Sequence, residues 1–557
     1  MGRRFWMRAM VCTALLGAGR GVRAQQFGED EKFTLRGHVV SAVTAEPVSG
    51  ALVVLIAGGR QAQFSAADGT FEFSGLLRGR YMVEAKKPGY FSDRELGLVR
   101  GGMEASYEVP AEEDATVKLT PEGVIYGRVE DEKGRALEGI QVQAERWIVS
   151  NGTRQLLGQG QWVGPADDEG NFRIAELPPG EYFLKFSEQG GVSSGFRSER
   201  ALERARTARN RLSPGQQGFG TQYYPGVADA ATANTIHVRP GAPVQIQQKL
   251  ERLRLYEVSG VVRGAPTESG FNVMLMAGGG GGGGGEMRGR AQVFPSTGEF
   301  RIEGVPAGRY LLQVSAQEAV ADRGTTRETQ LVAQTTVQVN GDISGLGMVL
   351  GHGSTLAVQV RDERAKTNEG PAQVQVTLQS PEFPNIAQQF VAPPPTARGP
   401  RGFENVASGT YSVEAFTFGQ GYVASLRCAG TDLLKEELKV ESGTSLAPIE
   451  VRVRSDGAEL TASAVRNGKP VVGRVVIYSE EYPKRSMSRE TFPNSTTWLG
   501  MFAPGTYKLI ATPGLAELEY KNPAGMAKYL ANATSVTLAP DTQMNLQVEV
   551  QDVEPEP

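Results

Sequence analysis

The sequence predicts an all-β protein made of tandem antiparallel Greek-key β-sandwiches, with a short helical insertion in the second unit. Three observations predict this fold class. A phrase of fixed spacing recurs along the chain, short stretches of alternating apolar and polar residues flank it, and turn-forming residues are dense, with 70 Gly and 31 Pro among 557 residues. A hydrophobic content of 40% is enough to build cores, and the length corresponds to about four or five domains.

The clearest phrase occurs three times. It reads ADGTFEFSGLLRGRYMVEA at 67–85, DEGNFRIAELPPGEYFLKF at 168–186 and STGEFRIEGVPAGRYLLQV at 296–314. A turn glycine comes first, Phe follows two residues later, a second glycine stands at ten and Tyr at twelve. These positions hold Gly69, Phe71, Gly79 and Tyr81, then Gly170, Phe172, Gly180 and Tyr182, then Gly298, Phe300, Gly308 and Tyr310. Glycine accepts the positive φ of a tight turn, and the strand that holds Phe alternates with a period of two.

Two weaker copies and a second phrase extend the repeat. The copies GPRGFENVASGTYSVEAF and STTWLGMFAPGTYKLIAT keep the later positions, as Gly409, Tyr411, Gly505 and Tyr507, but lose the complete opening Gly-x-Phe. The second phrase precedes the first and reads AEPVSGALVVLIA at 45–57, GRALEGIQVQAE at 134–145 and GKPVVGRVVIYSE at 468–480. Each unit is therefore expected to run strand, turn, strand, loop, strand, turn, strand, with one or two closing strands.

The spacing of the phrases divides the chain into five expected units. They are sandwich one at 31–120, sandwich two at 121–252 with a long loop and a basic helical insertion, sandwich three at 253–352 with a glycine-rich loop, and the degenerate sandwiches four at 353–453 and five at 454–551. The borders between them contain no long flexible linker.

These phrases resemble the carboxypeptidase regulatory-like domain, a transthyretin-like (prealbumin-like) β-sandwich. The pattern G-x-V, then G-x-P-x-x-G-x-x-V, then D-x-x-G-x-F-x-x-x-x-L-x-x-G-x-Y is matched well in copies one and two and less well later. The resemblance implies an accessory domain, and no catalytic zinc domain is visible beside it. Tandem copies in bacteria look like parts of exported, cell-surface or outer-membrane-associated proteins. Grouping with starch-binding-like sandwiches implies a carbohydrate-binding-like fold, by fold analogy alone.

The N-terminus reads as a signal peptide at 1–24. Arg3, Arg4 and Arg8 precede a short apolar run, and Val22-Arg23-Ala24 offers a cleavage site before Gln25. The run is too short to span a bilayer, so no transmembrane segment is expected in the mature chain. The predicted location is the periplasm, the outer-membrane surface or the extracellular space.

Cleavage makes the protein more acidic and leaves one thiol. Lys plus Arg falls from 58 to 53 against 62 acidic residues, so the net charge goes from −4 to −9. This charge gives no electrostatic case for nucleic-acid binding. Cys12 leaves with the signal peptide, and Cys428 is expected to be buried and structural.

The sequence offers no catalytic residue, cofactor site or metal site. His38, His237 and His352 lie in different units, without partners at metal-ligand spacing, and no G-x-S-x-G elbow is found. The acids Asp167, Asp168 and Glu169 are expected to be turn residues, with a calcium site as the alternative. The prediction is that the protein is not an enzyme.

Two segments of the second unit suggest surface contacts. SERALERARTARNRL at 198–212 is expected to be a basic helix, either a solvated surface helix or a docking site for an acidic partner. Trp147 and Trp162 flank a long loop, RWIVSNGTRQLLGQGQW, and with Tyr223 and Tyr224 they are the candidate ligand-binding residues. Either the tryptophans close the loop over the sandwich, which we favour, or they form a stacking platform.

The glycine run Gly278–Gly285 is expected to be an expanded hairpin loop of the third unit. It fits G-x-G-x-x-G, but no Gly-Lys-Ser/Thr follows and no βαβ pattern surrounds it, so it is not a phosphate loop. Taken together, the sequence favours an exported, non-catalytic scaffold or adhesion protein of the cell envelope. The alternative is a carbohydrate- or peptide-binding accessory protein that uses sandwich loops or sheet edges. The expected partner is another envelope protein or a glycan.

Overall fold

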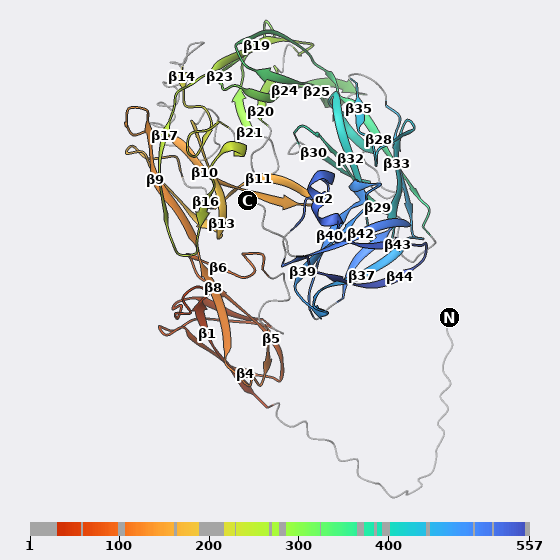
Figure 1. Cartoon of the computed structure of the whole chain (residues 1–557). Coiled ribbons are helices and arrows are strands. Elements are labelled where there is room, and N and C mark those ends of the chain that lie inside the picture. The colour runs from red at the N-terminus through yellow and green to blue at the C-terminus, as the bar shows by residue number, and fades with distance from the viewer. Residues whose placement is uncertain are drawn as a thin grey trace, which may run out of the picture. The chain divides into compact units, whose positions relative to one another are not determined.

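The structure is a computed structural model of the whole chain, and it confirms an all-β fold of packed sheets (Figure 1). It describes residues 31–551 except 57–58, 99–105, 161–163, 189–216, 229, 267–269, 278–285, 323–324, 365–371, 384–386, 393–400, 442–445, 494–495 and 515–516. The predicted signal peptide, the basic helix at 198–212, Trp162 and Gly278–Gly285 lie outside the described residues. The chain forms two compact units, Met1–Lys87 with Arg100–Leu119, and Pro88–Val99 with Thr120–Pro557.

The first unit contains one pair of sheets. One sheet includes the order β4-β1-β8 and the other has the order β3-β2-β5-β7. Its strands are β1 (Phe33–Ser41), β2 (Leu52–Ile56), β3 (Arg60–Phe64), β4 (Thr70–Leu76), β5 (Gly79–Lys86), β7 (Ser106–Val109) and β8 (Ala115–Pro121), and the short β6 (Tyr90–Ser92) belongs to the second unit. Alternate residues of β1 are buried, among them Leu35 and Val39, as the period-2 pattern predicts.

The second sheet pair begins the second unit, with orders β12-β9-β17 and β11-β10-β13-β15 and with β16 beside β13. Its elements are β9 (Gly123–Asp131), β10 (Ile140–Ser150), β11 (Thr153–Gln159), β12 (Asn171–Leu177), β13 (Gly180–Glu188), β15 (Gln222–Tyr223), the 3-10 turn η1 (Ala230–Thr232), β16 (Ile236–Val238) and β17 (Val244–Leu250). A small ribbon of β14 (Gln217–Gly218) and β18 (Leu253–Arg254) follows. Tyr182 and Phe186 are fully buried in the core.

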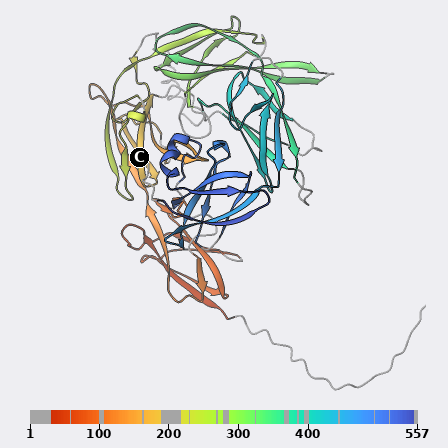
Figure 2. The ribbon, with the colours of Figure 1, turned by 45° about the vertical axis from the view of Figure 1, so that its right-hand side comes forward.

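The third sheet pair has the orders β22-β23-β19-β26 and β21-β20-β24-β25-β27. Its strands are β19 (Tyr256–Arg263), β20 (Asn272–Ala277), β21 (Glu286–Arg290), β22 (Gln292–Phe294), β23 (Glu299–Val305), β24 (Gly308–Asp322), β25 (Thr325–Val339), β26 (Ile343–Val349) and β27 (Gly351–His352). β20 and β21, which flank the glycine run, pair antiparallel with Ala277 opposite Glu286. The long strands β24 and β25 continue beyond the rest of their sheet (Figure 2).

The fourth sheet pair has the orders β31-β28-β36-β33-β34 and β30-β29-β32-β35. Its strands are β28 (Ser354–Asp362), β29 (Gln373–Gln379), β30 (Ala387–Val391), β31 (Gly402–Val406), β32 (Gly409–Phe418), β33 (Tyr422–Cys428), β34 (Thr431–Asp432), β35 (Leu438–Val440) and β36 (Ile449–Arg454). Cys428 is buried in this core, as expected.

The fifth sheet pair has the orders β38-β37-β41, with β44 beside β37, and β40-β39-β42-β43. Its elements are β37 (Ala458–Arg466), β38 (Lys469–Pro470), β39 (Gly473–Tyr478), the 3-10 turn η2 (Pro483–Arg485), β40 (Met487–Thr491), β41 (Thr497–Phe502), β42 (Gly505–Pro513), α2 (Pro523–Leu530), β43 (Thr534–Leu538) and β44 (Gln543–Glu549). The helix α2 lies here, and its Met526 and Tyr529 pack on the outer face of the sheet against Val476 and Ile510.

The repeated phrase has one physical cause in all five sheet pairs. In each, the hydroxyl of the signature tyrosine donates a hydrogen bond to the carbonyl oxygen four residues earlier. The pairs are Tyr81 with Leu77, Tyr182 with Pro178, Tyr310 with Pro306, Tyr411 with Ala407 and Tyr507 with Ala503, at 2.5–3.0 Å. The bond closes the turn between two strands, which fixes the spacing between the second glycine and the tyrosine.

The opening glycine of the phrase has a separate role, which Gly170 illustrates. Its φ is +80°, and a Cβ at this position would lie 2.5 Å from the carbonyl oxygen of Val129. Its own carbonyl oxygen accepts a hydrogen bond from the N–H of Val129 at 2.9 Å. The turn therefore docks on the first strand of the sheet at a distance that only glycine permits.

Each sheet pair also contains one parallel strand pair, which the prediction of purely antiparallel sheets did not include. The first strand lies beside the closing strand in β1–β8, β9–β17, β19–β26, β28–β36 and β37–β44. The other strand pairs of the described residues are antiparallel. The closing strand returns beside the first strand and runs in the same direction.

Polar contacts join neighbouring sheet pairs of the second unit. Arg309 forms an ion pair with Glu382 at 2.7 Å, between the third and fourth pairs. Lys435 pairs with Glu481 at 3.0 Å, between the fourth and fifth. The unit is therefore held together by side chains as well as by the chain itself.

Candidate interaction site

The segment between Trp147 and Trp162 forms a β-hairpin rather than the expected long loop. β10 and β11 pair over seven positions, from Ala144 opposite Gln159 to Ser150 opposite Thr153. The two-residue turn has Asn151 at φ +50° and Gly152 at φ +72°, the type I′ geometry that suits a right-twisted hairpin. β13 pairs with β10 only over Ile140–Glu145, so the outer half of the hairpin is two-stranded.

A buried polar cluster holds the base of the hairpin. Glu145 and Lys185 are 0% and 3% exposed, and Lys185 Nζ lies 3.2 Å from Glu145 Oε1. The hydroxyl of Tyr223 donates to the other carboxylate oxygen at 3.1 Å. Burying a charge is costly unless it is paired and hydrogen-bonded, and here both conditions are met.

An apolar cluster covers the same face of the sheet. Leu156, Phe183, Tyr223 and Ala230 are buried together, and Trp147 packs against them. The Arg154 guanidinium lies 4.7 Å from the centre of the Trp147 ring, at a distance typical of a cation–π contact. The structure therefore brings Trp147 and Tyr223 together, whereas Tyr224 packs against the main core of the sandwich.

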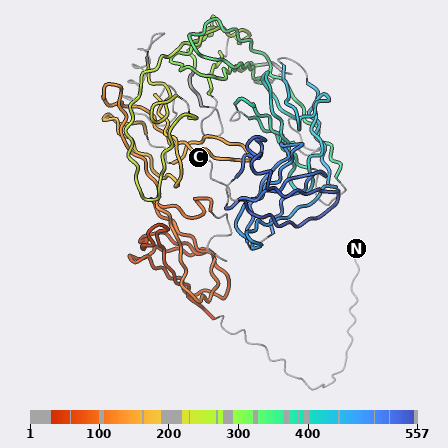
Figure 3. The backbone as a smooth tube through the Cα atoms, in the orientation of Figure 1, coloured from red at the N-terminus to blue at the C-terminus, as the bar shows by residue number. Residues whose placement is uncertain are grey.

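The tip of the hairpin docks on the fifth sheet pair (Figure 3). The N–H of Gly152 donates to Glu517 Oε1 at 2.9 Å, and its carbonyl oxygen accepts from the N–H of Lys521 at 3.1 Å. A Cβ at position 152 would lie 2.4 Å from the ring of Tyr520. Arg154 lies 3.8 Å from Glu519, which adds an ion pair beside the tip. Only glycine fits this close approach to an aromatic ring.

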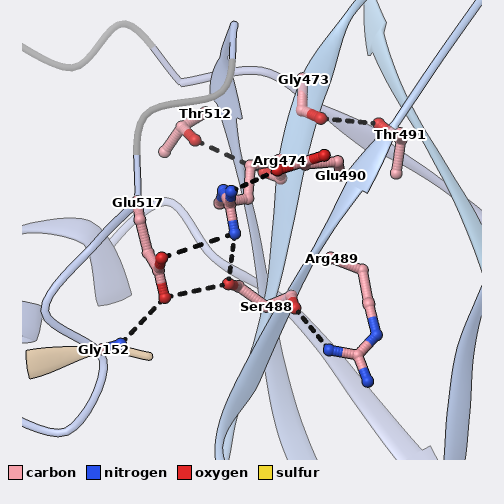
Figure 4. A network of polar contacts seen from close by, with 9 residues as sticks. All are labelled: Gly152, Gly473, Arg474, Ser488, Arg489, Glu490, Thr491, Thr512 and Glu517. Carbon is pink, nitrogen blue, oxygen red and sulfur yellow. Dashed lines mark hydrogen bonds and ion pairs between the residues drawn. The ribbon is translucent and has the colours of Figure 1, made fainter. Parts of the chain in front are cut away.

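Buried charged side chains surround the Glu517 carboxylate, which accepts the hydrogen bond from Gly152 (Figure 4). Arg474 lies 3.6 Å from Glu517 and 2.7 Å from Glu490, and all three side chains are at most 14% exposed. Ser488 accepts a hydrogen bond from Arg474 at 3.0 Å and donates to Glu517 at 3.5 Å. Glu517 is thus preoriented by one cation and one hydroxyl before it meets the hairpin.

Two further observations define the surroundings of the tip. Burial, with Glu517 nearby, raises the pKa of Tyr520 far above its ordinary value. Lys521 forms an ion pair with Glu414 of the fourth sheet pair at 2.8 Å. The segment 517–521 therefore contacts the second and fourth sheet pairs from the fifth.

The residues considered for chemistry have structural partners. The three histidines lie beside carboxylates, His38 by Asp114, His237 by Glu181 and His352 by Glu318. Within the described part of the chain, no three His, Cys, Asp or Glu side chains gather as a metal site.

Two acids of the 167–169 turn, Asp167 and Glu169, use their oxygens within the turn. Asp167 Oδ1 accepts from the N–H groups of Glu169 and Asn171, at 3.0 and 2.7 Å. These hydrogen bonds lower the pKa of Asp167, and the one from the Asn171 N–H has the largest effect.

The sequence prediction missed several residues of this site, and only one pair of them carried a signal. Asn151-Gly152 between two alternating stretches is a strong hairpin signal, and it predicts two strands where a loop was expected. Glu145, Lys185 and Glu517 carry no such signal, because their partners are 40 or more residues away in the chain.

Comparison with solved structures found matches at low sequence identity. A streptococcal ancillary pilin matches at 12% identity over 58% of this chain and 99% of that chain, with a TM-score of 0.18. A minor pilin of Streptococcus agalactiae matches at 14% over 40% and 96%, with a TM-score of 0.20. The TIE protein of Bacillus anthracis matches at 10% over 95% and 76%, with a TM-score of 0.15.

Two other results complete the comparison. No curated protein matches the chain. Among the described residues, every helix is too short or too polar to cross a bilayer.

The family model for the carboxypeptidase regulatory-like domain matches residues 34–120, the segment that contains the sheet pair of the first unit. This match agrees with the resemblance carried by the Gly-x-Phe and Gly-x-Tyr phrase. Residues 34–120 are therefore similar to the carboxypeptidase regulatory-like domain.

Proposed function

We propose that the chain is an exported, non-catalytic scaffold or adhesion protein of the cell envelope, built from sandwiches at 31–120, 121–252, 253–352, 353–453 and 454–551. The observation that carries the proposal is the docking of Gly152 on Glu517 and Lys521. This contact joins two residues, Gly152 and Glu517, that are 365 positions apart in the chain. A string of independent modules needs no such contact, whereas a scaffold that presents surfaces in a fixed relation does.

The ion pairs between neighbouring sheet pairs support the same proposal. Arg309–Glu382, Lys435–Glu481 and Lys521–Glu414 each cross a border between sandwiches. The first two pairs are exposed, and such pairs contribute little individually, roughly 0–1 kcal/mol, whereas Lys521–Glu414 is half-buried. Together with the hairpin contact, they hold the second to fifth sandwiches in a fixed orientation relative to one another.

The test is expression of the full chain, with a C-terminal tag, in a Gram-negative host. The expected result is cleavage before Gln25, recovery in the envelope fraction and capture of envelope proteins by a chemical cross-linker. Gly152→Ala should reduce that capture and Gly468→Ala should not. Retention of unprocessed chain in the cytoplasm, or hydrolytic activity of the purified protein, would contradict the proposal.

A binding function for glycan or peptide is the second candidate, and one exposed face favours it. Phe416 and Phe418 are each 46% exposed on β32, with ring centres 4.9 Å apart. Gln375 and Gln373 lie opposite them on β29, so amide groups flank the rings. Aromatic rings beside amides suit a sugar, which offers both C–H faces and hydroxyl groups.

Trp147 is a weaker platform for the same ligand because Arg154 already covers its ring. A glycan array probed with the mature chain distinguishes the two sites. Phe416→Ala should abolish binding if the β32 face is the site, and Trp147→Ala should abolish it if the hairpin is. An array without signal would remove this second candidate.

A further inference from the structure

The turn that docks on the fifth sheet pair contains the dipeptide that is chemically the least stable in proteins. In Asn-Gly, the glycine has no side chain to hinder attack by its own nitrogen on the preceding side-chain amide, and asparagine is thermolabile for this reason. Asn151 is exposed at the tip, and Gly152 is buried against Tyr520. The side chain that would be attacked is therefore in solvent, whereas the attacking nitrogen lies in the docking surface.

We propose that Asn151 is a modification site that converts to isoaspartate. The conversion is suppressed while the hairpin is docked. Once it occurs, it releases the hairpin irreversibly. The Gly152 nitrogen first loses its proton to hydroxide and attacks Cγ of Asn151. The new N–Cγ bond forms as the Cγ–Nδ2 bond breaks, and the amide nitrogen leaves as ammonia after taking a proton from water. Water then opens the cyclic succinimide to aspartate or isoaspartate, and nothing is oxidised or reduced.

Docking opposes the first step in two ways. The N–H of Gly152 is held by Glu517 Oε1 at 2.9 Å, so removing that proton would place a negative charge beside a carboxylate. The Gly152 carbonyl oxygen is held by the N–H of Lys521, which prevents the rotation that the attack requires. A hydrogen bond to a charged group is strong enough to slow the reaction at Asn151 on the order of tenfold.

The product cannot dock as asparagine does. Isoaspartate inserts an additional carbon into the main chain, which shifts the Gly152 N–H and carbonyl groups away from Glu517 and Lys521. It also adds a negative charge to the turn whose next residue, Gly152, is held by the Glu517 carboxylate. Both changes weaken the contact between the hairpin tip and segment 517–521. The conversion therefore releases the second sheet pair from the fifth irreversibly.

The chain contains its own control. Asn467-Gly468 forms a turn of the same kind, with φ of +52° and +72°, against +50° and +72° at Asn151-Gly152. A Cβ at Gly468 would meet nothing within 4 Å, and in the described part of the chain no carboxylate accepts its N–H. At this turn the N–H of Asn467, and not that of the glycine, donates to Glu549 at 2.7 Å. The two sites therefore share turn geometry and differ in whether the attacking glycine nitrogen is held by a carboxylate.

The experiment incubates the purified native chain at mildly alkaline pH and follows both peptides by mass spectrometry and an isoaspartate-specific methyltransferase. Asn467 is expected to convert on the order of tenfold faster than Asn151. In Glu517→Ala the rate at Asn151 should rise toward that of Asn467, while Asn467 is unchanged. Equal rates in the native chain, or an unchanged rate at Asn151 in Glu517→Ala, would overturn the proposal.

A second measurement covers the case in which Glu517→Ala fails to fold. Amide hydrogen exchange of the native chain should be slower at Gly152 than at Gly468, and equal exchange overturns the protective role of docking. The release is tested on chain that has converted at Asn151. Its Gly152 amide should lose protection, and retained protection would overturn the release.

Discussion

The hydroxyl of Tyr507 donates a hydrogen bond of 3.0 Å to the carbonyl oxygen of Ala503, inside the core of the fifth sheet pair. Tyr507 is 3% exposed, so Tyr507→Phe leaves a buried carbonyl oxygen without its partner. We expect a loss of about 1–2 kcal/mol in the free energy of unfolding. The equivalent bond of Tyr81 is exposed, so Tyr81→Phe should cost less in the same denaturant titration.

Gly152→Ala is expected to free the hairpin tip. Alanine at φ +72° costs about 1–2 kcal/mol, and here its Cβ also meets the Tyr520 ring. Gly468→Ala has the same unfavourable backbone conformation, but its Cβ meets no other group. Limited trypsin digestion should therefore cut at Arg154 much faster in Gly152→Ala than in wild type or Gly468→Ala. Equal cleavage in the two variants would mean that docking of the tip does not protect the hairpin.

Lys185→Met is expected to destabilise the second sandwich by about 3–5 kcal/mol, because Glu145 would stay buried without its cation. The double variant Glu145→Gln with Lys185→Met removes both charges and should recover most of that loss. Chemical denaturation followed by tryptophan fluorescence reports on this sandwich when Trp162 and Trp498 are replaced by Phe, so that Trp147 is the remaining tryptophan of the predicted mature chain. If the double variant were as unstable as the single one, packing rather than charge would explain the effect.

Asp362 is expected to make the fourth sandwich sensitive to acid. Hydrogen bonds from Arg364, supported by the N–H of Ala372, lower the pKa of Asp362 to about 2 from 3.8. The folded state thus prefers the ionised form, so this stabilisation is present above about pH 4 and is lost as the pH falls toward 2. Asp362→Asn should lower the melting temperature at neutral pH and flatten its decline between pH 4 and 2. A parallel decline in wild type and variant would show that Asp362 does not contribute.

Cys428 is expected to be unreactive in the folded protein. Burial, with Glu450 nearby, raises the pKa of its thiol, and the thiol lies 3.2 Å from the carbonyl oxygen of Ala447. After signal cleavage it is the single cysteine of the predicted mature chain. A thiol reagent should therefore react only upon unfolding, and rapid labelling under native conditions would contradict this prediction.

The fold was predictable because its strongest signals are local. The turn at Gly170 and the corner at Tyr182 lie within 15 residues of one another, and their spacing follows from backbone geometry alone. The fold class was confirmed on this basis. The match at 34–120 likewise confirms the resemblance for the first unit.

The candidate site was predictable only in part, because its contacts are not local. Trp147 and Tyr223 were selected as aromatic residues, and they do lie in one cluster. The partner of Tyr223, Glu145, is 78 residues away, and that of Gly152, Glu517, is 365 residues away. No pattern in the sequence indicates either contact. Whether these aromatic residues bind a ligand stays a prediction.

The parallel pairing of first and closing strands has a mechanical consequence. In each sheet pair the chain enters at one end of this strand pair and leaves at the other. A pulling force between entry and exit would therefore slide the two strands past each other. Their hydrogen bonds would share the load and break together, instead of opening one at a time. A protein assembled from such modules would resist tension along its chain far better than it resists peeling.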